Sequence, residues 1–153
     1  MSAPVLTLAS ASPRRRDLIA RLGVTPVGVS PAEIDETPLK GELPREYAKR
    51  MAREKVLAVD SDRYVLAGDT VVAAGRRILP KAEVEATARK CLELLSGRRH
   101  RVLSAIALKS PDGTLHEKLN ETIVRFKRLS DDEIAAYLAS GEWDGKAGGY
   151  AIQ

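Results

Sequence analysis

The chain has 153 residues, of which 44% are hydrophobic and 30% are charged, so it can bury a core as one domain. Its net charge of +4 permits nucleic-acid binding, but an aromatic content of 4% leaves few side chains for stacking on bases. No apolar run approaches membrane-spanning length, and the N-terminal residues lack the basic and apolar regions of a signal peptide. Cys91 is the only cysteine, so no internal disulfide can form. We therefore expect a cytoplasmic protein that binds neither membranes nor nucleic acid.

The N-terminal segment predicts a strand that runs into a helix. Val5–Leu8 is a short apolar run typical of a buried strand. Ser12 is a good N-cap, Pro13 suits the first helical position and Gly23 suits the helix end. The helix is expected to bury one apolar face, which consists of Leu18, Ile19 and Leu22.

The next region predicts a loop, a helix and a strand. The loop covers Ser30–Gly41, and the helix is expected to begin at Pro44 and to end near Val59. The apolar stripe of this helix consists of Tyr47, Ala48, Met51, Ala52, Val56 and Val59. A strand at Tyr64–Val72 follows, and Ala74–Arg77 turns the chain back into a short antiparallel strand.

The second half of the chain alternates helices and strands. A helix is predicted over Ala82–Leu95, and strands over Arg101–Leu108 and Leu115–Lys127. The core face of that helix is expected to consist of Val84, Ala88, Leu92 and Leu95. Ser130–Glu133 is a capping box that opens a last helix, which runs to about Ala139. This order, with at least two hairpins, predicts an α/β fold with a mixed sheet.

The segment Ser10–Arg16 is a candidate phosphate site. A helix N-terminus offers unpaired backbone N–H groups and a positive potential. Ser10 and Ser12 add hydroxyl groups, and Arg14 and Arg15 add planar cations that match phosphate oxygens. The alternative is a capped helix with a solvated basic first turn. Because cations are unfavourable at a helix N-terminus, three consecutive arginines there favour a bound anion.

Asp69 places one carboxylate inside an apolar stretch of sequence. An ionised carboxylate in a buried strand is costly unless it is paired or binds a metal, and Gly68 would let a ligand approach the backbone closely. The alternative is that the strand ends at Gly68 and that Asp69 starts a turn. The spacing alone leaves both interpretations open.

Three further candidates depend on charged side chains. Glu33, Asp35 and Glu36 form an acidic loop whose oxygens could hold Mg2+ or Mn2+, although such runs are more often solvated surface loops. Lys55 shares a helix face with apolar residues, so it could point into a pocket or extend to solvent, which is the commoner arrangement. Lys81 follows a short strand and could reach a phosphate.

Taken together and in order, these segments resemble the Maf family of nucleoside triphosphate pyrophosphatases. The matching blocks are Leu8–Arg15, Glu33–Glu36, Ala52–Val56, Ala67–Val72, Lys81, Leu95–Val102 and Lys146–Gln153. The resemblance implies one domain over residues 1–153. It also implies the Maf/ITPase-like α/β fold, an elongated mixed sheet with helices around a central nucleotide-binding cleft. Family members continue with a C-terminal segment that is not seen in this sequence.

The resemblance implies metal-dependent hydrolysis of a nucleoside triphosphate to the monophosphate and pyrophosphate, with Mg2+ or Mn2+ as the cofactor. Asp69 would be the acid/base residue that activates water, and it would hold the metal together with Glu33. The phosphate-binding residues would be Ser10, Arg15, Lys55 and Lys81. Phosphoryl chemistry depends mostly on positioning and charge neutralisation, so cations, a metal and one carboxylate suffice.

Three residues indicate which base is preferred. Arg14, Thr70 and Gln153 resemble the set found in the branch of the family that acts on dTTP and UTP. Thr70 and Gln153 can both donate and accept hydrogen bonds at a pyrimidine edge. The expected substrates are therefore dTTP and UTP, and modified pyrimidine nucleotides as a possible extension.

Other functions stay open at this point. The chain could bind a nucleotide as a regulator without turnover, because of its short C-terminus, or hydrolyse a purine nucleotide such as ITP. A nucleic-acid-binding module would show steeply salt-dependent affinity for DNA or RNA. A homodimer is plausible from the family resemblance alone.

Overall fold

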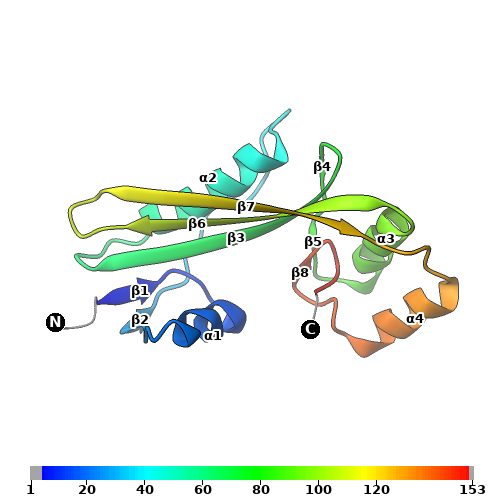
Figure 1. Ribbon diagram of the computed structural model, residues 1–153, viewed down its shortest axis with the longest axis horizontal. Helices are drawn as coiled ribbons and strands as arrows, with labels where there is room; N and C mark the ends of the chain where they lie inside the picture. The colour runs from blue at the N-terminus through cyan, green and yellow to red at the C-terminus, as the bar shows by residue number, and fades with distance from the viewer. Residues whose placement is uncertain (1–4, 152–153) are drawn as a thin grey trace. The chain divides into compact units, whose positions relative to one another are not determined.

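The computed structural model describes residues 5–151, which form four helices and eight strands (Figure 1). The chain divides into two compact units. The first unit consists of Met1–Asp69 and Ser104–Asn120, and the second consists of Thr70–Leu103 and Glu121–Gln153. Among the described residues, no helix combines the length and the apolar character needed to cross a membrane.

The main sheet is mixed, as the sequence predicts. It has six strands in the order β2-β1-β3-β6-β7, with β4 paired to β3. The long strands are β3 (Tyr64–Ala74), β6 (Arg99–Lys109) and β7 (Leu115–Arg125). β1 (Leu6–Leu8) runs parallel to both β2 (Gly28–Val29) and β3, whereas β4 (Arg77–Ile78) is antiparallel to β3. Each long strand begins in one unit and ends in the other.

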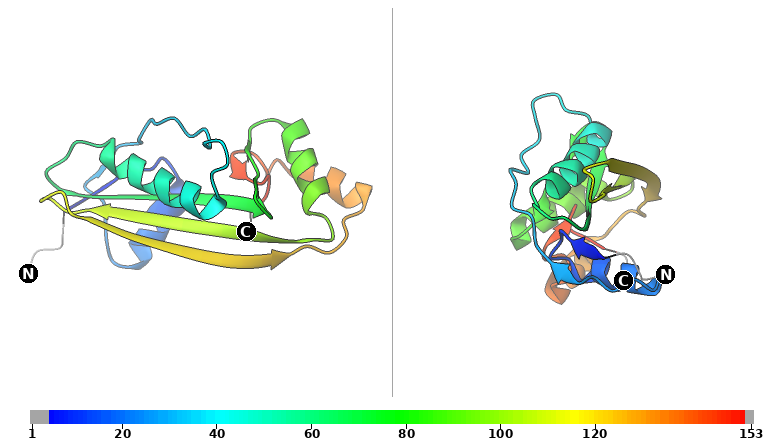
Figure 2. Two further views of the ribbon diagram at one scale, coloured as in Figure 1. Left: turned by 90° about the horizontal axis from the view of Figure 1, so that it is seen from above. Right: turned by 90° about the vertical axis from the view of Figure 1, so that its left-hand side faces the viewer.

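The first unit contains α1 (Pro13–Arg21) and α2 (Pro44–Leu57). Figures 1 and 2 show α2 running alongside the strands. Four residues of the predicted stripe, Ala48, Met51, Ala52 and Val56, are buried, together with Pro44, which was not predicted as part of it, whereas the predicted Tyr47 is only partly buried. The helix ends two residues before the predicted Val59, which is itself buried.

The prediction for the apolar face of α1 was wrong at two of its three residues. Ile19 is buried in a cluster with Leu6 and Leu8, but Leu18 is 56% exposed and Leu22 is 78% exposed. The helix is only nine residues long, so it contacts the core through a single side chain. Leu22 follows the last helical residue and caps the helix instead of extending its buried face.

The second unit contains α3 (Glu85–Leu95), which begins three residues later than predicted. The predicted first residue, Ala82, belongs instead to β5 (Lys81–Ala82), which pairs antiparallel with β8 (Lys146–Ala147). The ladder partner lies more than sixty residues further along the chain, so local helix propensity could not reveal it. Val84 precedes the helix and is 57% exposed rather than part of its core face.

The last helix agrees with its sequence signals. α4 (Asp131–Ser140) begins at a complete capping box, in which the Ser130 side chain accepts from the Glu133 N–H and the Glu133 side chain accepts from the Ser130 N–H. Gly141 ends it with a positive φ of 72°, a backbone conformation that glycine adopts without a steric penalty.

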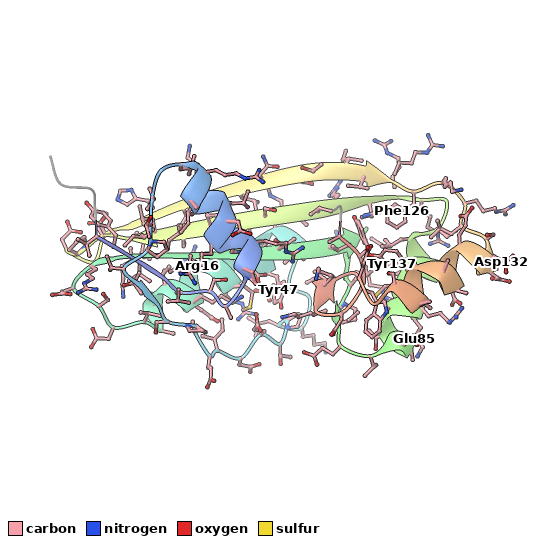
Figure 3. The ribbon with its side chains drawn as sticks, turned by 90° about the horizontal axis from the view of Figure 1, so that it is seen from below. Arg16, Tyr47, Glu85, Phe126, Asp132 and Tyr137 are labelled. Carbon is pink, nitrogen blue, oxygen red and sulfur yellow. The ribbon has the colours of Figure 1, made fainter. Side chains whose placement is uncertain are left out.

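An aromatic cluster occupies the interior of the second unit. His100 on β6 is 2% exposed and shares a 2.5 Å hydrogen bond between its Nε2 and the Tyr150 hydroxyl. Phe126, labelled in Figure 3, contacts both rings edge to face. The Nδ1 of His100 is buried and has no hydrogen-bond partner in the described part of the chain. A protonated ring would leave one N–H unsatisfied there, which is unfavourable.

This cluster predicts a pH dependence of stability. Burial lowers the pKa of His100 below its ordinary value of 6.5, so the unfolded chain takes up a proton that the folded protein excludes. The contribution of His100 is complete above the unfolded pKa and is lost as the pH falls. In urea unfolding between about pH 7.5 and about pH 5, His100→Gln should flatten the loss of stability seen for the wild type.

The exposed His116 provides the matched control. His116→Gln should leave the pH dependence of the free energy of unfolding as it is in the wild type. An unchanged slope in His100→Gln would contradict the prediction.

Candidate active site

The end of β1 and the start of α1 place a serine and an arginine in contact. Ser10 is 8% exposed, and its Oγ accepts hydrogen bonds from Arg15 Nη1 at 3.0 Å and from the Ser12 N–H at 3.2 Å. Within the described helix, the Ser12 side chain makes no capping bond, and the first turn carries no acidic residue. The backbone N–H groups of this turn and the guanidinium of Arg15 therefore suit an anion.

Gly68 brings Arg15 to the central strand of the site. A Cβ at position 68 would lie 3.1 Å from the Nε of Arg15 and 3.3 Å from the carbonyl oxygen of Ala105. Glycine thus leaves the space that the arginine side chain fills. The result is that a cation from α1 lies against the residue next to Asp69.

Asp69 lies inside a continuous strand. β3 extends five residues beyond it to Ala74, so the alternative interpretation that the strand ends at Gly68 was wrong. The Asp69 side chain is 14% exposed, and its Oδ1 accepts a hydrogen bond from Lys55 Nζ at 2.9 Å. The carboxylate is therefore paired, as a charge in an apolar strand must be.

Lys55 points inward from α2. Its side chain is 14% exposed, and its Nζ also lies 3.0 Å from an oxygen of Glu36, whose side chain is 55% exposed. The extension to solvent that is commoner for such lysines is not what the structure shows. One ammonium group joins the acidic loop, α2 and β3 within the first unit.

Opposing effects set the charge states of these groups. Burial raises the pKa of Asp69 above its ordinary value, while the cations of Lys55 and Arg15 hold part of that rise back. Burial also lowers the pKa of Arg15, which the carboxylate of Asp69 opposes. A carboxylate with a raised pKa accepts a proton more readily, which suits a general base.

Two carboxylates can hold a divalent cation here. Asp69 and Glu36 converge on the same ammonium group, so their oxygens already share one cation. Mg2+ and similar ions are held by one or two carboxylates together with substrate phosphates, which this pair fits. Among the described residues, no group of three or more Asp, Glu, His or Cys side chains could form a site made by protein alone.

The other predicted site residues are more scattered. Arg14 is exposed on α1, and Glu33 is exposed in the acidic loop. Thr70 is exposed on β3, and Lys81 is exposed on β5, both in the second unit. Gln153 lies outside the described residues. The structure therefore brings together Ser10 and Arg15 near Gly68, and Lys55 with Asp69.

Glu36 is a site residue that the sequence groups with Glu33 and Asp35 as a possible metal ligand but does not single out. The acidic run contains three carboxylates within four residues, and the family resemblance assigned the metal to Glu33. Periodicity does not help in a loop, so nothing in the run itself indicated which carboxylate reaches Lys55. The contact that positions Glu36 comes from α2, where the hydroxyl of Tyr47 donates a hydrogen bond to the Glu36 carbonyl oxygen.

Comparisons with known proteins agree on a family. A family model described as Maf-like protein matches residues 5–153. A protein of Novosphingobium aromaticivorans named dTTP/UTP pyrophosphatase is 66% identical over 153 residues, which cover 98% of this chain and 76% of that protein. One of the same name from Paramagnetospirillum magneticum is 64% identical over 152 residues, covering 97% of this chain and 80% of that protein.

Solved structures share the fold at much lower identity. The Ham1 protein of Staphylococcus aureus matches with a TM-score of 0.53 at 17% identity, covering 78% of this chain and 70% of that one. A HAM1 protein from Coxiella burnetii matches with a TM-score of 0.50 at 21% identity, covering 79% of this chain and 71% of that one. The expected fold class is thereby confirmed.

The ion cluster predicts the effect of removing its cation. Lys55→Met leaves the Asp69 carboxylate without its closest partner, so the pKa of Asp69 should rise further. The variant should lose about 1–3 kcal/mol of stability near neutral pH. This loss should shrink in acid, where a protonated Asp69 needs no cation. Urea unfolding as a function of pH measures both effects.

Lys49→Met is the matched control, because Lys49 lies on the same helix with a side chain 38% exposed, and its ion pair with the exposed Glu46 is a 4.0 Å contact. It should change stability little at any pH. If Lys55→Met destabilised the protein equally at acid and neutral pH, the loss would come from packing and not from the charge of Asp69.

Proposed function

The chain belongs to the Maf family, and we propose that it is a nucleoside triphosphate pyrophosphatase acting on dTTP and UTP. The observation that carries this proposal is the buried Asp69 carboxylate with Lys55 bound to it and Arg15 nearby. A carboxylate with a raised pKa beside fixed cations is what a hydrolase needs to accept a proton from water and to hold phosphates. The names of the relatives support dTTP and UTP as substrates.

In this proposal each charged group has a separate task. Asp69 accepts a proton from the attacking water, whose oxygen bonds to the α-phosphorus while the bond from that phosphorus to the bridging oxygen breaks and pyrophosphate leaves. Arg15 and Ser10 hold phosphate oxygens at the start of α1, where the backbone N–H groups also point. Lys55 and Lys81 supply further positive charge to the triphosphate. These groups act by position and charge, as phosphoryl transfer requires.

A divalent cation completes the proposed site. Mg2+ or Mn2+, when bound, neutralises phosphate charge and polarises phosphoryl oxygens. Asp69 and Glu36 are the residues that we propose to hold it, since both meet at Lys55. Glu33 is exposed on the same loop, and its role as a ligand stays a prediction.

Base recognition is assigned to Arg14, Thr70 and Gln153. The exposed hydroxyl of Thr70 follows Asp69 directly along β3 and is free to turn as donor or acceptor towards a pyrimidine. Modified pyrimidine nucleotides fall within the same proposal. The proposal also includes a cytoplasmic location, which accords with the buried free Cys91. It includes a homodimer as well.

The first test is pyrophosphate release from dTTP, UTP, CTP, GTP, ITP and 7-methyl-GTP, with Mg2+ and with Mn2+. Turnover confined to dTTP and UTP, and abolished by EDTA, is the expected result. Preference for ITP or 7-methyl-GTP would overturn the base assignment. Binding without turnover of any nucleotide by the folded protein would indicate a regulator.

A single substitution tests the proposed base. Asp69→Asn keeps the shape of the side chain but removes the proton acceptor, so kcat for dTTP should fall by about a hundredfold or more. Nucleotide should still bind, as measured by calorimetry. Asp62→Asn, in an exposed position before β3, is the control and should retain wild-type kcat. Near-normal turnover in Asp69→Asn would remove Asp69 from the mechanism.

A further inference from the structure

The acidic loop is fastened to α2 by an arginine. Arg50 Nε and Nη2 donate to the two carboxylate oxygens of Glu42 at 2.7 and 2.8 Å. The same Nη2 donates to the carbonyl oxygen of Thr37 at 3.1 Å, and the Leu39 N–H donates to Glu42 at 3.0 Å. The Glu42 side chain is only 8% exposed. A two-pronged arginine–carboxylate pair of this kind fixes geometry as well as adding energy.

A tyrosine binds the loop at Glu36, the residue whose carboxylate pairs with Lys55. The hydroxyl of Tyr47, a residue labelled in Figure 3, donates to the backbone carbonyl oxygen of Glu36 at 2.6 Å. The guanidinium of Arg50 lies over the Tyr47 ring, 5.7 Å from its centre. Burial, helped by the carboxylates of Asp69 and Glu36, raises the pKa of Tyr47 to about 12. The hydroxyl therefore keeps its proton and remains a donor at neutral pH.

The ion pair with Lys55 cannot by itself fix Glu36. The Glu36 side chain is 55% exposed, and pairs that involve exposed carboxylates contribute little once solvent screening and side-chain entropy are counted. The loop has no strand or helix between Ser30 and Leu39. Its position at Glu36 and Thr37 depends instead on the two carbonyl contacts from α2.

We propose that Tyr47 and Arg50 are positioning residues, which hold the loop so that the Glu36 carboxylate stays beside Asp69 and Lys55. This inference rests on the proposed function, in which Glu36 and Asp69 hold the divalent cation. In this proposal Tyr47 and Arg50 contact the loop and Glu42, and they act on the cation only through Glu36. They set the distance between the two carboxylates, and so the affinity for the cation.

The same helix provides a matched control. Arg53, three residues after Arg50, also makes a two-pronged pair, with Glu117 at 2.6 and 3.1 Å. Its partner lies on β7 and not on the acidic loop. Arg50→Gln and Arg53→Gln therefore each remove a two-pronged arginine–carboxylate pair from one helix. Arg50→Gln also removes the contacts of Arg50 with Glu54 and with the Thr37 carbonyl, so only this substitution releases the loop.

The test measures Mn2+ binding directly, by electron paramagnetic resonance titration of the full chain with Mn2+ alone. Tyr47→Phe removes one hydrogen bond and should weaken Mn2+ binding by roughly fivefold. Arg50→Gln should weaken it at least as much, and Arg53→Gln should leave it unchanged. Circular dichroism and urea unfolding show whether each variant is folded.

A second background separates positioning from general loss of structure. In Glu36→Gln the carboxylate that the loop presents is gone, so adding Tyr47→Phe should weaken Mn2+ binding no further. A full additional loss in the double variant would overturn the proposal, as would wild-type affinity in folded Tyr47→Phe.

The two proposals fail in different ways. Turnover of dTTP by a wild-type protein that binds no Mn2+ would overturn the positioning role and leave pyrophosphatase activity in place. Mn2+ binding that depends on Tyr47 through Glu36, in a protein that releases no pyrophosphate from any nucleotide, would support the positioning role and remove the proposed function.

Discussion

The candidate site depends on one ammonium group shared between two carboxylates. Lys55 lies 2.9 Å from Asp69 and 3.0 Å from Glu36. Taking charges out of water costs several kcal/mol per ion, and mutual attraction offsets that cost only where the geometry is good. This cluster therefore adds little net stability, and the packing of α2 and the pairing of β3 must hold it. What the cluster provides is charge at fixed positions, which can interact with a polyphosphate without rearrangement of the protein groups.

Local signals in the sequence predicted most of the fold. The capping box at Ser130 and the proline that opens α2 act over one helical turn, so they can be interpreted without knowing the rest of the structure. Features that depend on distant partners were missed. The sequence predicts that a helix begins at Ala82, whereas Ala82 belongs to β5, whose partner strand β8 comes much later in the chain. The exposure of Leu18 likewise depends on how little of α1 meets the sheet.

The candidate site was predictable in type but not in arrangement. A carboxylate inside an apolar strand pointed to Asp69 because a lone buried charge needs a partner. That partner, Lys55, had two open interpretations, since a lysine stem packs equally well whether its head points inward or outward. Choosing Glu36 from the acidic run required the contact with Tyr47, eleven residues further on. The charged residues of the site could thus be predicted from the sequence, but the contacts that bring particular ones together could not.

The close approach of Arg15 to Gly68 limits how this protein can change. A side chain at position 68 would meet Arg15 at 3.1 Å and backbone at 3.3 Å, and only the arginine is flexible enough to move. A larger residue at 68 would therefore push the Arg15 side chain away from β3 and would still meet the carbonyl oxygen of Ala105. The missing side chain at position 68 is thus what lets a cation from α1 lie beside the strand that carries Asp69.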